Sequence, residues 1–452
     1  MHRDLNARVR GFRPVGICEV DINGPLPRLS AVAGIVGRDY VAAQVLVRLA
    51  TEPLGVLLIP LGPQEVLPEQ LAETIWAQLR PVILDRVREA GPAAAPDSLS
   101  PDGLRLGASP PYVRRRDEVL AAPPRISVVL CTRDPQDEIL DCLAALERQD
   151  YPDYEIVVVD NAPTTDALAA VVAARPGKVP IRRVVEPRPG LSWARNCGLH
   201  TATGRIVAYI DDDEVPDRYW LAEIARGFRT RDEVAAVSGM ILPAALESQA
   251  QDWYEQFGGH SKGRGFTQAV FDVDSHAAQS PLYPLPPFGA GGNVAFDRAL
   301  LVERGGFDVA LGAGTPAHSG EETAMLCDLM LAGHTVVYRP SAFVRHHHYA
   351  EVADMARQLY GYGVGLTAFY TRAVLRDPRR CFTLARLTPT AARDLFGRDS
   401  VRTATIRADY PAELLRAQRR GMLRGPAAYL RSRREQRRVR RAYGNVLAPA
   451  GR

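Results

Sequence analysis

Residues 205–216 constrain the fold more than any other part of the sequence, because an apolar run leads directly into three carboxylates. Residues 206–210 read Ile-Val-Ala-Tyr-Ile. A continuous run of this kind is typical of a central strand in a parallel sheet, which is covered on both faces. Ligands of open α/β sheets bind just beyond the carboxyl ends of such strands. The sequence therefore predicts an α/β fold with a binding site at Asp211, Asp212 and Asp213.

The chemistry of adjacent carboxylates predicts a metal at this site. Three neighbouring carboxylates repel one another, and a divalent cation that prefers oxygen ligands relieves the repulsion. We therefore expect Mg²⁺ or Mn²⁺. If the segment is extended, Asp211 and Asp213 share one face and hold the metal, whereas Asp212 points away and caps the following turn or helix. The alternative is a solvated acidic turn ahead of Pro216.

The bulk properties describe a globular protein with two or three domains. Its 452 residues are 46% hydrophobic and 24% charged, and the net charge of +4 does not by itself indicate a nucleic-acid partner. Six cysteines form no Cys-x-x-Cys pair, which argues against a zinc ribbon or a disulfide scaffold. The first residues lack an apolar signal core, and the apolar run at 54–61 is too short to span a bilayer. We expect a cytoplasmic protein.

Residues 1–90 read as a small α/β accessory domain with a structural or partner-binding role. No catalytic constellation is visible there. We expect strands at 17–22 and 56–59 and helices at 40–49 and 67–90, the last kinked or split at Pro81. Residues 91–124 are rich in Pro, Ala, Ser and Gly, which is typical of a solvated linker and marks a domain boundary.

Two further predicted strands end in polar residues. Residues 126–130 lead to Thr132, and residues 154–159 lead to Asp160 about thirty positions later, as a βαβ unit requires. Repeated ends of this kind build a nucleotide crevice, in which Asp160 would accept hydrogen bonds from a base or a ribose. The alternative for Asp160 is a helix N-cap. Gly190 then precedes a helix whose first backbone N–H groups would face an anion, and Arg195 on that helix would reach a diphosphate or a base.

Taken in order, these motifs resemble glycosyltransferase family 2, whose members have the A-type glycosyltransferase fold and use nucleotide-sugars. The second half agrees, because residues 288–296, 305–308 and 320–323 look like that family's acceptor-side loop and catalytic motif. The resemblance covers about residues 124–350. It implies a Rossmann-like catalytic domain over residues 125–350.

The resemblance also implies roles for individual residues. Asp211 and Asp213 would hold the metal on the diphosphate, and Glu322 matches the catalytic base, at a place where the family more often shows Asp. Glu321 is the alternative base. The residues assigned to the nucleotide are Thr132, Arg133, Asp160, Asn161, Arg195 and Asp212. His346 and His348 would share one face of an extended segment, where many relatives carry a histidine near the metal, with His347 on the other face.

Residues 351–452 are predicted to be helical and rich in arginine, most densely at 431–441. Basic helical tails suit anionic lipid surfaces, which would place the protein peripherally at the inner face of the plasma membrane. A solvated or partly disordered helix is the alternative. Nucleic-acid binding is the weakest of the three interpretations, because no aromatic platform is interleaved with the basic run.

The resulting hypothesis is an inverting, metal-dependent hexosyl- or related glycosyltransferase. It would move a sugar from a UDP-, GDP- or dTDP-sugar to a sugar, lipid-linked or small-molecule acceptor, in cell-surface polysaccharide, glycolipid or secondary-metabolite glycosylation. A sugar-nucleotide nucleotidyltransferase is one alternative, but residues 131–135 lack its glycine-rich, arginine-containing loop. A non-catalytic nucleotide-sugar-binding module is another, and the intact Asp211, Asp213 and Glu322 argue against it.

Overall fold

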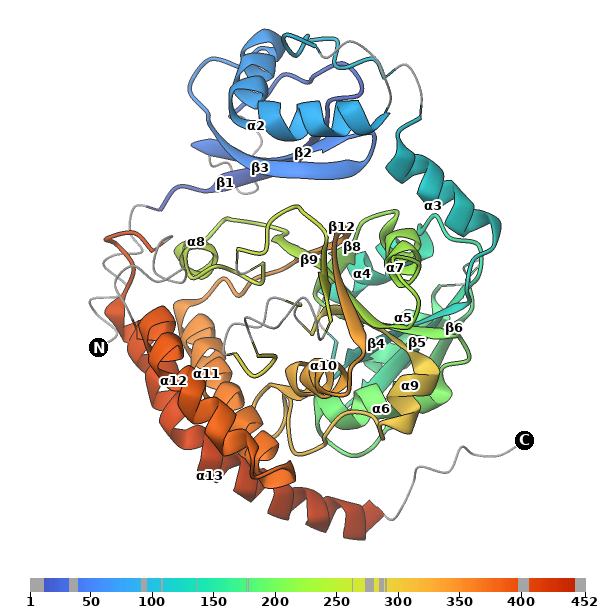
Figure 1. Ribbon diagram of the computed structural model, residues 1–452, viewed down its shortest axis with the longest axis vertical. Helices are drawn as coiled ribbons and strands as arrows, with labels where there is room; N and C mark the ends of the chain where they lie inside the picture. Colours follow the sequence, from blue (N-terminus) through green and yellow to red (C-terminus); the bar gives the residue numbers. More distant parts are fainter. Residues whose placement is uncertain are drawn as a thin grey trace.

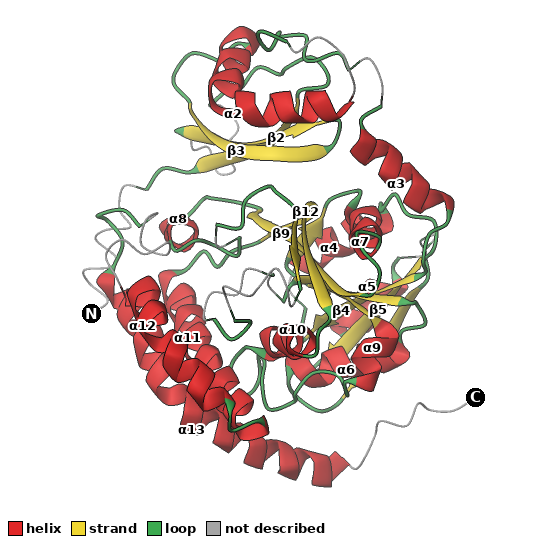
Figure 2. Ribbon diagram, in the orientation of Figure 1, coloured by secondary structure: helices red, strands yellow, loops and turns green. Residues whose placement is uncertain are grey.

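The computed structural model has three parts: an N-terminal α/β unit, a central mixed sheet covered by helices, and a layer of long C-terminal helices (Figure 1, Figure 2). The structure describes residues 12–31, 40–90, 96–106, 109–135, 137–175, 177, 179–261, 263–272, 280–283, 288, 291–396 and 406–443.

The N-terminal unit is a three-stranded sheet with one helix on it. Strands β1 (Val15–Asp21) and β3 (Glu52–Pro60) flank β2 (Ala42–Leu49), parallel and antiparallel to it respectively, and α2 (Pro68–Ala90) covers one face. The prediction of a helix at 40–49 was wrong. Val45 and Leu46 are both buried because β2 is the central strand, with α2 on one side and the main core on the other. Helix α2 runs through Pro81 as one element.

Part of the segment predicted as a solvated linker is a packed helix. Helix α3 (Pro111–Ala121) begins at a proline, which suits a first helical turn. Its Tyr112 is buried, and the hydroxyl donates to the Leu49 carbonyl at 2.6 Å. The composition of 91–124 suggested a solvated linker, but these tertiary contacts order its second half. Residues 91–95 and 107–108 of this segment lie outside the described residues.

The central sheet has the strand order β10-β12-β9-β11-β7-β4-β5-β6, and β8 pairs with β12. Strands β4 to β7 are parallel, whereas β11 is antiparallel to both β7 and β9. The strands are β4 (Ile126–Thr132), β5 (Tyr154–Asn161), β6 (Ile181–Glu186), β7 (Ile206–Asp211), β8 (Glu214–Pro216), β9 (Val234–Pro243), β10 (Ala269–Phe271), β11 (Asn293–Asp297) and β12 (Thr335–His346). Strands β5 and β7 lie on opposite sides of β4, so the chain order reverses there and the ends of β4 and β7 meet.

Both faces of this sheet are covered, as the apolar runs predicted. Val129, Val157 and Val207 pack into one core, while Val128 and Ala208 pack into a second core on the other face. The covering helices are α4 (Glu138–Glu147), α5 (Ala167–Ala173), α6 (Leu191–Thr201), α7 (Trp220–Phe228), α9 (Arg298–Glu303) and α10 (Glu321–Leu331). Helix α8 (Gln249–Gln256) packs instead on α11 (Val352–Arg376).

The C-terminal layer consists of α11 (Val352–Arg376), α12 (Arg380–Phe396) and α13 (Ala412–Tyr443), which lie side by side in Figure 1. Helix α13 packs closely on α11 because glycines line the contact. A Cβ added at Gly421 would lie 2.2 Å from the Tyr360 carbonyl oxygen, and one added at Gly425 would lie 2.5 Å from the Val364 carbonyl oxygen. The arginine-rich segment up to Tyr443 is therefore a packed helix with one solvated side, not a detached tail.

Within the described residues, no helix combines the length and apolar character needed to cross a bilayer.

Candidate active site

The acidic segment at the end of β7 is a turn. Strand β7 ends at Asp211, residues 212 and 213 form the turn, and β8 begins at Glu214. The extended geometry expected for this segment was wrong. Asp211 and Asp213 nevertheless line the same cavity, together with Glu214, because the turn folds them toward one side.

Asp212 points to the neighbouring strand, where Thr132 at the end of β4 donates a hydrogen bond to its carboxylate. Burial raises the pKa of Asp212 to about 6, which this hydrogen bond opposes and the charge of Asp211 reinforces. Asp212 therefore does not cap the following helix, as the sequence had suggested; it joins the ends of β4 and β7 at the point where the strand order reverses.

Two further carboxyl groups, those of Asp213 and Glu214, lie close to Asp211. Glu214 is only 1% exposed, and its carboxylate accepts the backbone N–H of Asp211 at 3.2 Å. Burial raises the pKa of both Asp213 and Glu214 well above the ordinary values, and repulsion from Asp211 adds to the effect. A bound divalent cation would lower these pKa values, since its charge stabilises the ionised carboxylates.

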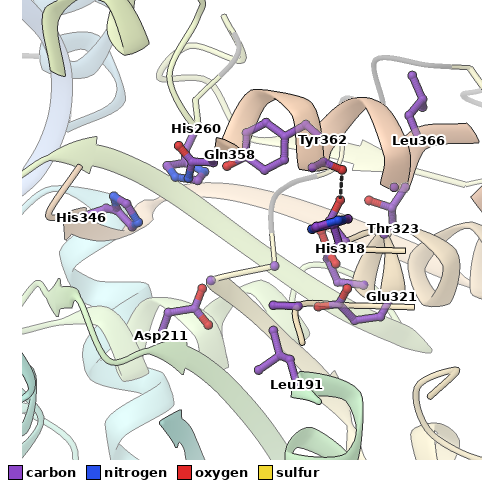
Figure 3. Close-up of a pocket in the computed structure, with 18 of the residues that line it drawn as sticks. Leu191, Asp211, His260, His318, Glu321, Thr323, His346, Gln358, Tyr362 and Leu366 are labelled. Atoms are coloured by element: carbon purple, nitrogen blue, oxygen red, sulfur yellow. Dashed lines mark hydrogen bonds between the residues drawn. The ribbon is translucent and has the colours of Figure 1, made fainter. Parts of the chain in front are cut away.

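His346 lies beside this turn because β12 pairs with β8. The pairing sets His346 opposite Glu214 and leaves His346 Nε2 3.4 Å from an Asp213 carboxylate oxygen. His346 and His348 lie on the same side, with their Nδ1 atoms 2.7 Å apart, as the alternation predicted. Figure 3 shows His346 and Asp211 on one side of the cavity and Glu321 and His318 on the other.

The contacts of His348 fix which nitrogen of His346 carries the proton. His348 Nε2 lies 2.9 Å from a Glu255 carboxylate oxygen, which can only accept, so His348 donates there. When His348 carries this proton alone, its Nδ1 accepts and His346 donates from its own Nδ1. Burial lowers the pKa of His346 well below its ordinary value and keeps the ring neutral, so its Nε2 lone pair faces Asp213. A lone pair opposite a carboxylate oxygen is favourable when a cation lies between them, and the residues present thus fit a metal.

His260, on the loop after α8, extends this group. The nitrogens that His260, His346 and His348 offer lie within 4.8 Å of one another, and the Tyr254 hydroxyl lies 3.0 Å from His260 Nε2. This edge of the cavity thus adds imidazole nitrogens to the oxygen ligands of the acidic turn.

The opposite wall is the first turn of α10, which presents two glutamates with different contacts. Glu321 is 3% exposed and accepts a hydrogen bond from Arg195 at 2.8 Å. Burial raises the pKa of Glu321 to about 8; the charge of Glu322 adds to this and Arg195 opposes it. Glu322 lines the cavity, is partly exposed, and has no hydrogen-bond or ion-pair partner among the described residues.

Arg195 connects the two walls. Besides Glu321, its guanidinium donates to Asp211 at 3.3 Å and to the Gly291 carbonyl at 3.1 Å, and it is 2% exposed. The buried arginine therefore sets the distance between the acidic turn and α10. Its expected contact with a diphosphate or a base stays a prediction.

The other residues assigned to the nucleotide have structural partners here. Asp160 binds Arg183 at 2.6 and 2.9 Å and caps no helix, since Asp166 takes that position for α5. Asn161 holds the loop before α6 by accepting the Gly190 N–H at 3.0 Å. Arg133 is half-exposed, 3.9 Å from a carboxylate oxygen of Asp134. The cavity wall formed by the described residues includes none of the set Thr132, Arg133, Asp160 and Asn161.

The cavity that contains the acidic turn has a volume of about 500 Å³. Its far side comes from α11 and from the segment after α8, which the sequence motifs did not single out. The cavity residues missed there, beside the turn and in the loop before α10 are Glu214, His260, His318, Gln358 and Tyr362. Residues 289–290 of the expected acceptor-side loop lie outside the described residues, whereas Gly291 and Gly292 line the cavity.

Comparison with known proteins identifies the family of the central domain. The family model described as Glycosyl transferase family 2 matches residues 127–301. The domain that contains residues 127–301 belongs to glycosyltransferase family 2. The A-type fold expected from the motifs is thereby confirmed, together with the N-terminal α/β unit and the helical C-terminal region.

Two curated relatives of the family 2 domain illustrate the similarity. Over 228 residues, this chain is 22% identical to the glucosyl-dolichyl phosphate glucuronosyltransferase of Haloferax volcanii. The match covers 49% of this chain and 69% of the relative. Over 227 residues, this chain is 29% identical to the succinoglycan biosynthesis protein ExoM of Rhizobium meliloti, covering 48% and 65%.

Among solved structures, a mannosyltransferase from Pyrobaculum calidifontis in complex with GDP-Man and Mn²⁺ is similar, with 21% identity and a TM-score of 0.42. The similarity covers 75% of this chain and 90% of that one. Helix α10 and His346 of β12 lie beyond the residues that the family model matches, so their assignment rests on the geometry described above.

Proposed function

We propose that the protein is an inverting glycosyltransferase that transfers a sugar from a nucleoside diphosphate sugar to an acceptor hydroxyl. One observation carries the proposal. Asp211 and Asp213 line the same cavity as Glu322, and buried Arg195 contacts both walls. At the reacting carbon, the leaving diphosphate needs its negative charge neutralised, whereas the attacking hydroxyl needs to lose a proton. Acidic groups on two walls of one cavity suit these needs, since one group can hold a cation and the other can accept the proton.

On the donor side, Asp211, Asp213 and His346 would hold Mg²⁺ or Mn²⁺. The bound cation would supply neutralisation of the charge that develops on the departing nucleoside diphosphate. The chain prepares this arrangement in two ways. The turn at 212–213 gathers the carboxylates, and the contact of His348 with Glu255 directs the His346 Nε2 lone pair toward Asp213.

On the acceptor side, Glu322 would accept the proton of the attacking hydroxyl. Glu321 is less suited to this role because Arg195 occupies one of its oxygens and the side chain is buried. A single displacement, with the hydroxyl entering from the side of Glu322 as the diphosphate leaves toward the acidic turn, inverts the anomeric carbon. The acceptor class we propose is a saccharide or a lipid-linked saccharide, and the proposed place of action is the cytoplasm or the inner face of the plasma membrane.

The test is donor binding measured by calorimetry with UDP, GDP and dTDP, each with and without Mn²⁺. We expect the intact protein to bind one of them with an affinity that Mn²⁺ increases, and Asp213→Ala to lose the increase. Asp150→Ala is the control, because the Asp150 side chain is about half-exposed and, among the described residues, its carboxylate pairs with Arg218 alone, at 3.6 Å. Metal-dependent affinity that survives unchanged in Asp213→Ala would overturn the assignment. Slow metal-dependent hydrolysis of the matching nucleotide-sugar distinguishes an enzyme from a binding module.

A further inference from the structure

A second cavity, separate from the active site, lies between α13, α11 and the loop after α9. Its volume is about 480 Å³, and it shares no lining residue with the active-site cavity. Six arginines line it and Asp308 is its single acidic side chain. The arginines are Arg304, Arg372, Arg376, Arg433, Arg437 and Arg440. We propose that this cavity, which we call the arginine pocket, binds a phosphate-bearing anion.

The position of the arginines follows from helix geometry. Arg433, Arg437 and Arg440 are spaced by four and three residues, which places them on one side of α13. Gln436 on the same side accepts a hydrogen bond from the Trp193 indole at 2.6 Å and so fixes α13 against α6. The intervening Arg434 and Arg438 are exposed and do not line the pocket.

The carboxylates nearby leave most of this positive charge unpaired. Arg372 binds Asp308 at 2.9 Å and Asp328 at 2.7 Å, and Arg376 binds the same Asp328. By contrast, the three arginines of α13 have no carboxylate partner in the described part of the chain. Arg433 and Arg440 instead lie near aromatic rings, 6.0 Å from the Tyr429 centroid and 5.6 Å from the Trp193 centroid.

Two buried donors in the pocket's lining residues also lack acceptors. Arg304 Nε and Arg372 Nη1 are buried and form no hydrogen bond with the described residues. Buried charged donors without partners are costly, and because neither nitrogen is itself accessible, an anion in the pocket would offset that cost through its charge. Guanidinium groups match phosphate oxygens in geometry and charge. The volume exceeds what one phosphate group fills, so we assign the pocket to a diphosphate or an organic phosphate.

Two sources supply this chemistry, a soluble phosphate compound and the head group of an anionic phospholipid. Both present phosphate oxygens to the same arginines. The inference is independent of the proposed glycosyl transfer, because neither the acidic turn nor Glu322 takes part in it.

The experiment compares two double variants of α13 with the same charge change and the same spacing. Arg433→Gln/Arg437→Gln removes two arginines that line the pocket, and Arg434→Gln/Arg438→Gln removes two equally exposed arginines that do not. Inorganic pyrophosphate is titrated by calorimetry at low salt, with EDTA present so that no divalent cation can recruit it to the acidic turn. We expect saturable binding by the intact protein, weakened about tenfold or more by the pocket variant and less than threefold by the control.

A second arm identifies the source of the phosphate. Vesicles of phosphatidylglycerol and of phosphatidylcholine are sedimented with the same three proteins. If the intact protein and the control variant pellet with phosphatidylglycerol vesicles and the pocket variant does not, the pocket binds a lipid head group. If the intact protein binds pyrophosphate but no vesicles, the pocket binds a soluble phosphate. Absence of saturable pyrophosphate binding by the intact protein, or equal losses in the two double variants, would overturn the proposal. Equal melting temperatures of the three proteins show that the helix is intact.

Discussion

At the residue scale, Glu321 and Glu322 show how two identical side chains one position apart acquire different chemistry. Both line the cavity, but Glu321 is buried and held by Arg195, whereas Glu322 is partly exposed. We expect Glu322→Gln to leave donor binding intact and to lower turnover by about 10² to 10⁴, the usual range for loss of a general base. Glu321→Gln should lower turnover much less.

Turnover with donor and acceptor, together with donor affinity from calorimetry, separates these effects. If the two variants exchange phenotypes, the base is Glu321 and the motif has been aligned one residue out of place.

The contact between Glu255 and His348 gives a second prediction, for metal affinity. Glu255→Gln keeps the size of the side chain but removes the acceptor-only carboxylate that fixes the His348 proton, and through it the His346 lone pair. We expect Mn²⁺ affinity to fall about 10- to 100-fold, as for other partners of metal-binding histidines. Glu303→Gln, on the exposed side of α9, is the matched control. The measurement is Mn²⁺ titration, and unchanged affinity in Glu255→Gln would contradict the assigned tautomers.

The sequence identified some of these residues and missed others for a physical reason. Asp211 and Asp213 were predicted from the end of an apolar strand, although the turn, not alternation, brings them together. Glu214 was missed because burial of a carboxylate is set by packing that a motif does not encode. Glu255 and His260 were missed because they come from a helix and a loop that join the site only through tertiary contacts.

At the scale of elements, the contact between α11 and α13 rests on close approach of two backbones. Alanine is better than glycine in an isolated helix by about 1 kcal/mol. At Gly421, however, the added Cβ would lie 2.2 Å from a backbone oxygen of α11, so the helices must separate. We expect Gly421→Ala to lower the free energy of unfolding by about 1–3 kcal/mol, because overpacking outweighs propensity.

Chemical denaturation measures this change, with Arg434→Ala on the exposed side of α13 as the control. If Gly421→Ala is more stable than the intact protein, α13 packs only loosely on α11.

Elements with a continuous apolar run were predicted well, and short mixed ones were not. Strands β4, β5 and β7 carry runs that only a covered strand accommodates. In β2 the sequence Ala-Ala-Gln-Val-Leu-Val-Arg-Leu fits a helix or a strand, and hydrogen bonds from β1 and β3 decide between them. Helix α3 and the packing of α13 were likewise set by partners far away in sequence.

At the scale of the whole molecule, Glu223 of α7 lies at the centre of a buried ion-pair network that joins the N-terminal unit, α3 and the central sheet. It pairs with Arg339 at 2.8 Å, Arg226 at 3.0 Å and Arg116 at 3.8 Å, and Arg226 lies 3.8 Å from Glu52 of β3. We expect Glu223→Gln to destabilise the protein by about 3 kcal/mol, because it leaves buried guanidinium groups without their carboxylate. Glu73→Gln, exposed on α2, is the control.

The pH dependence of this effect follows from the pKa of Glu223. Burial alone would raise that pKa, but the arginines outweigh burial and lower it below its ordinary value of 4.5. The carboxylate therefore contributes stability above about pH 4.5 and loses it as the pH falls through the lowered pKa. Denaturation at pH 7 and at pH 4 should show a smaller difference between the two proteins at the lower pH. An equal difference at both values would exclude the charge as its cause.

The glycines that let α13 lie on α11 also bear on how this chain can diverge during evolution. A surface helix rich in arginine is expected to tolerate many substitutions, since charged residues on a solvated side can be replaced by other polar residues. Here Arg434 and Arg438 are exposed on a helix whose packed side accepts no side chain at Gly421 or Gly425. Homologous chains that keep this layer should therefore retain small residues at those two positions while the exposed charges vary, and chains that have lost the glycines should have lost the layer as well.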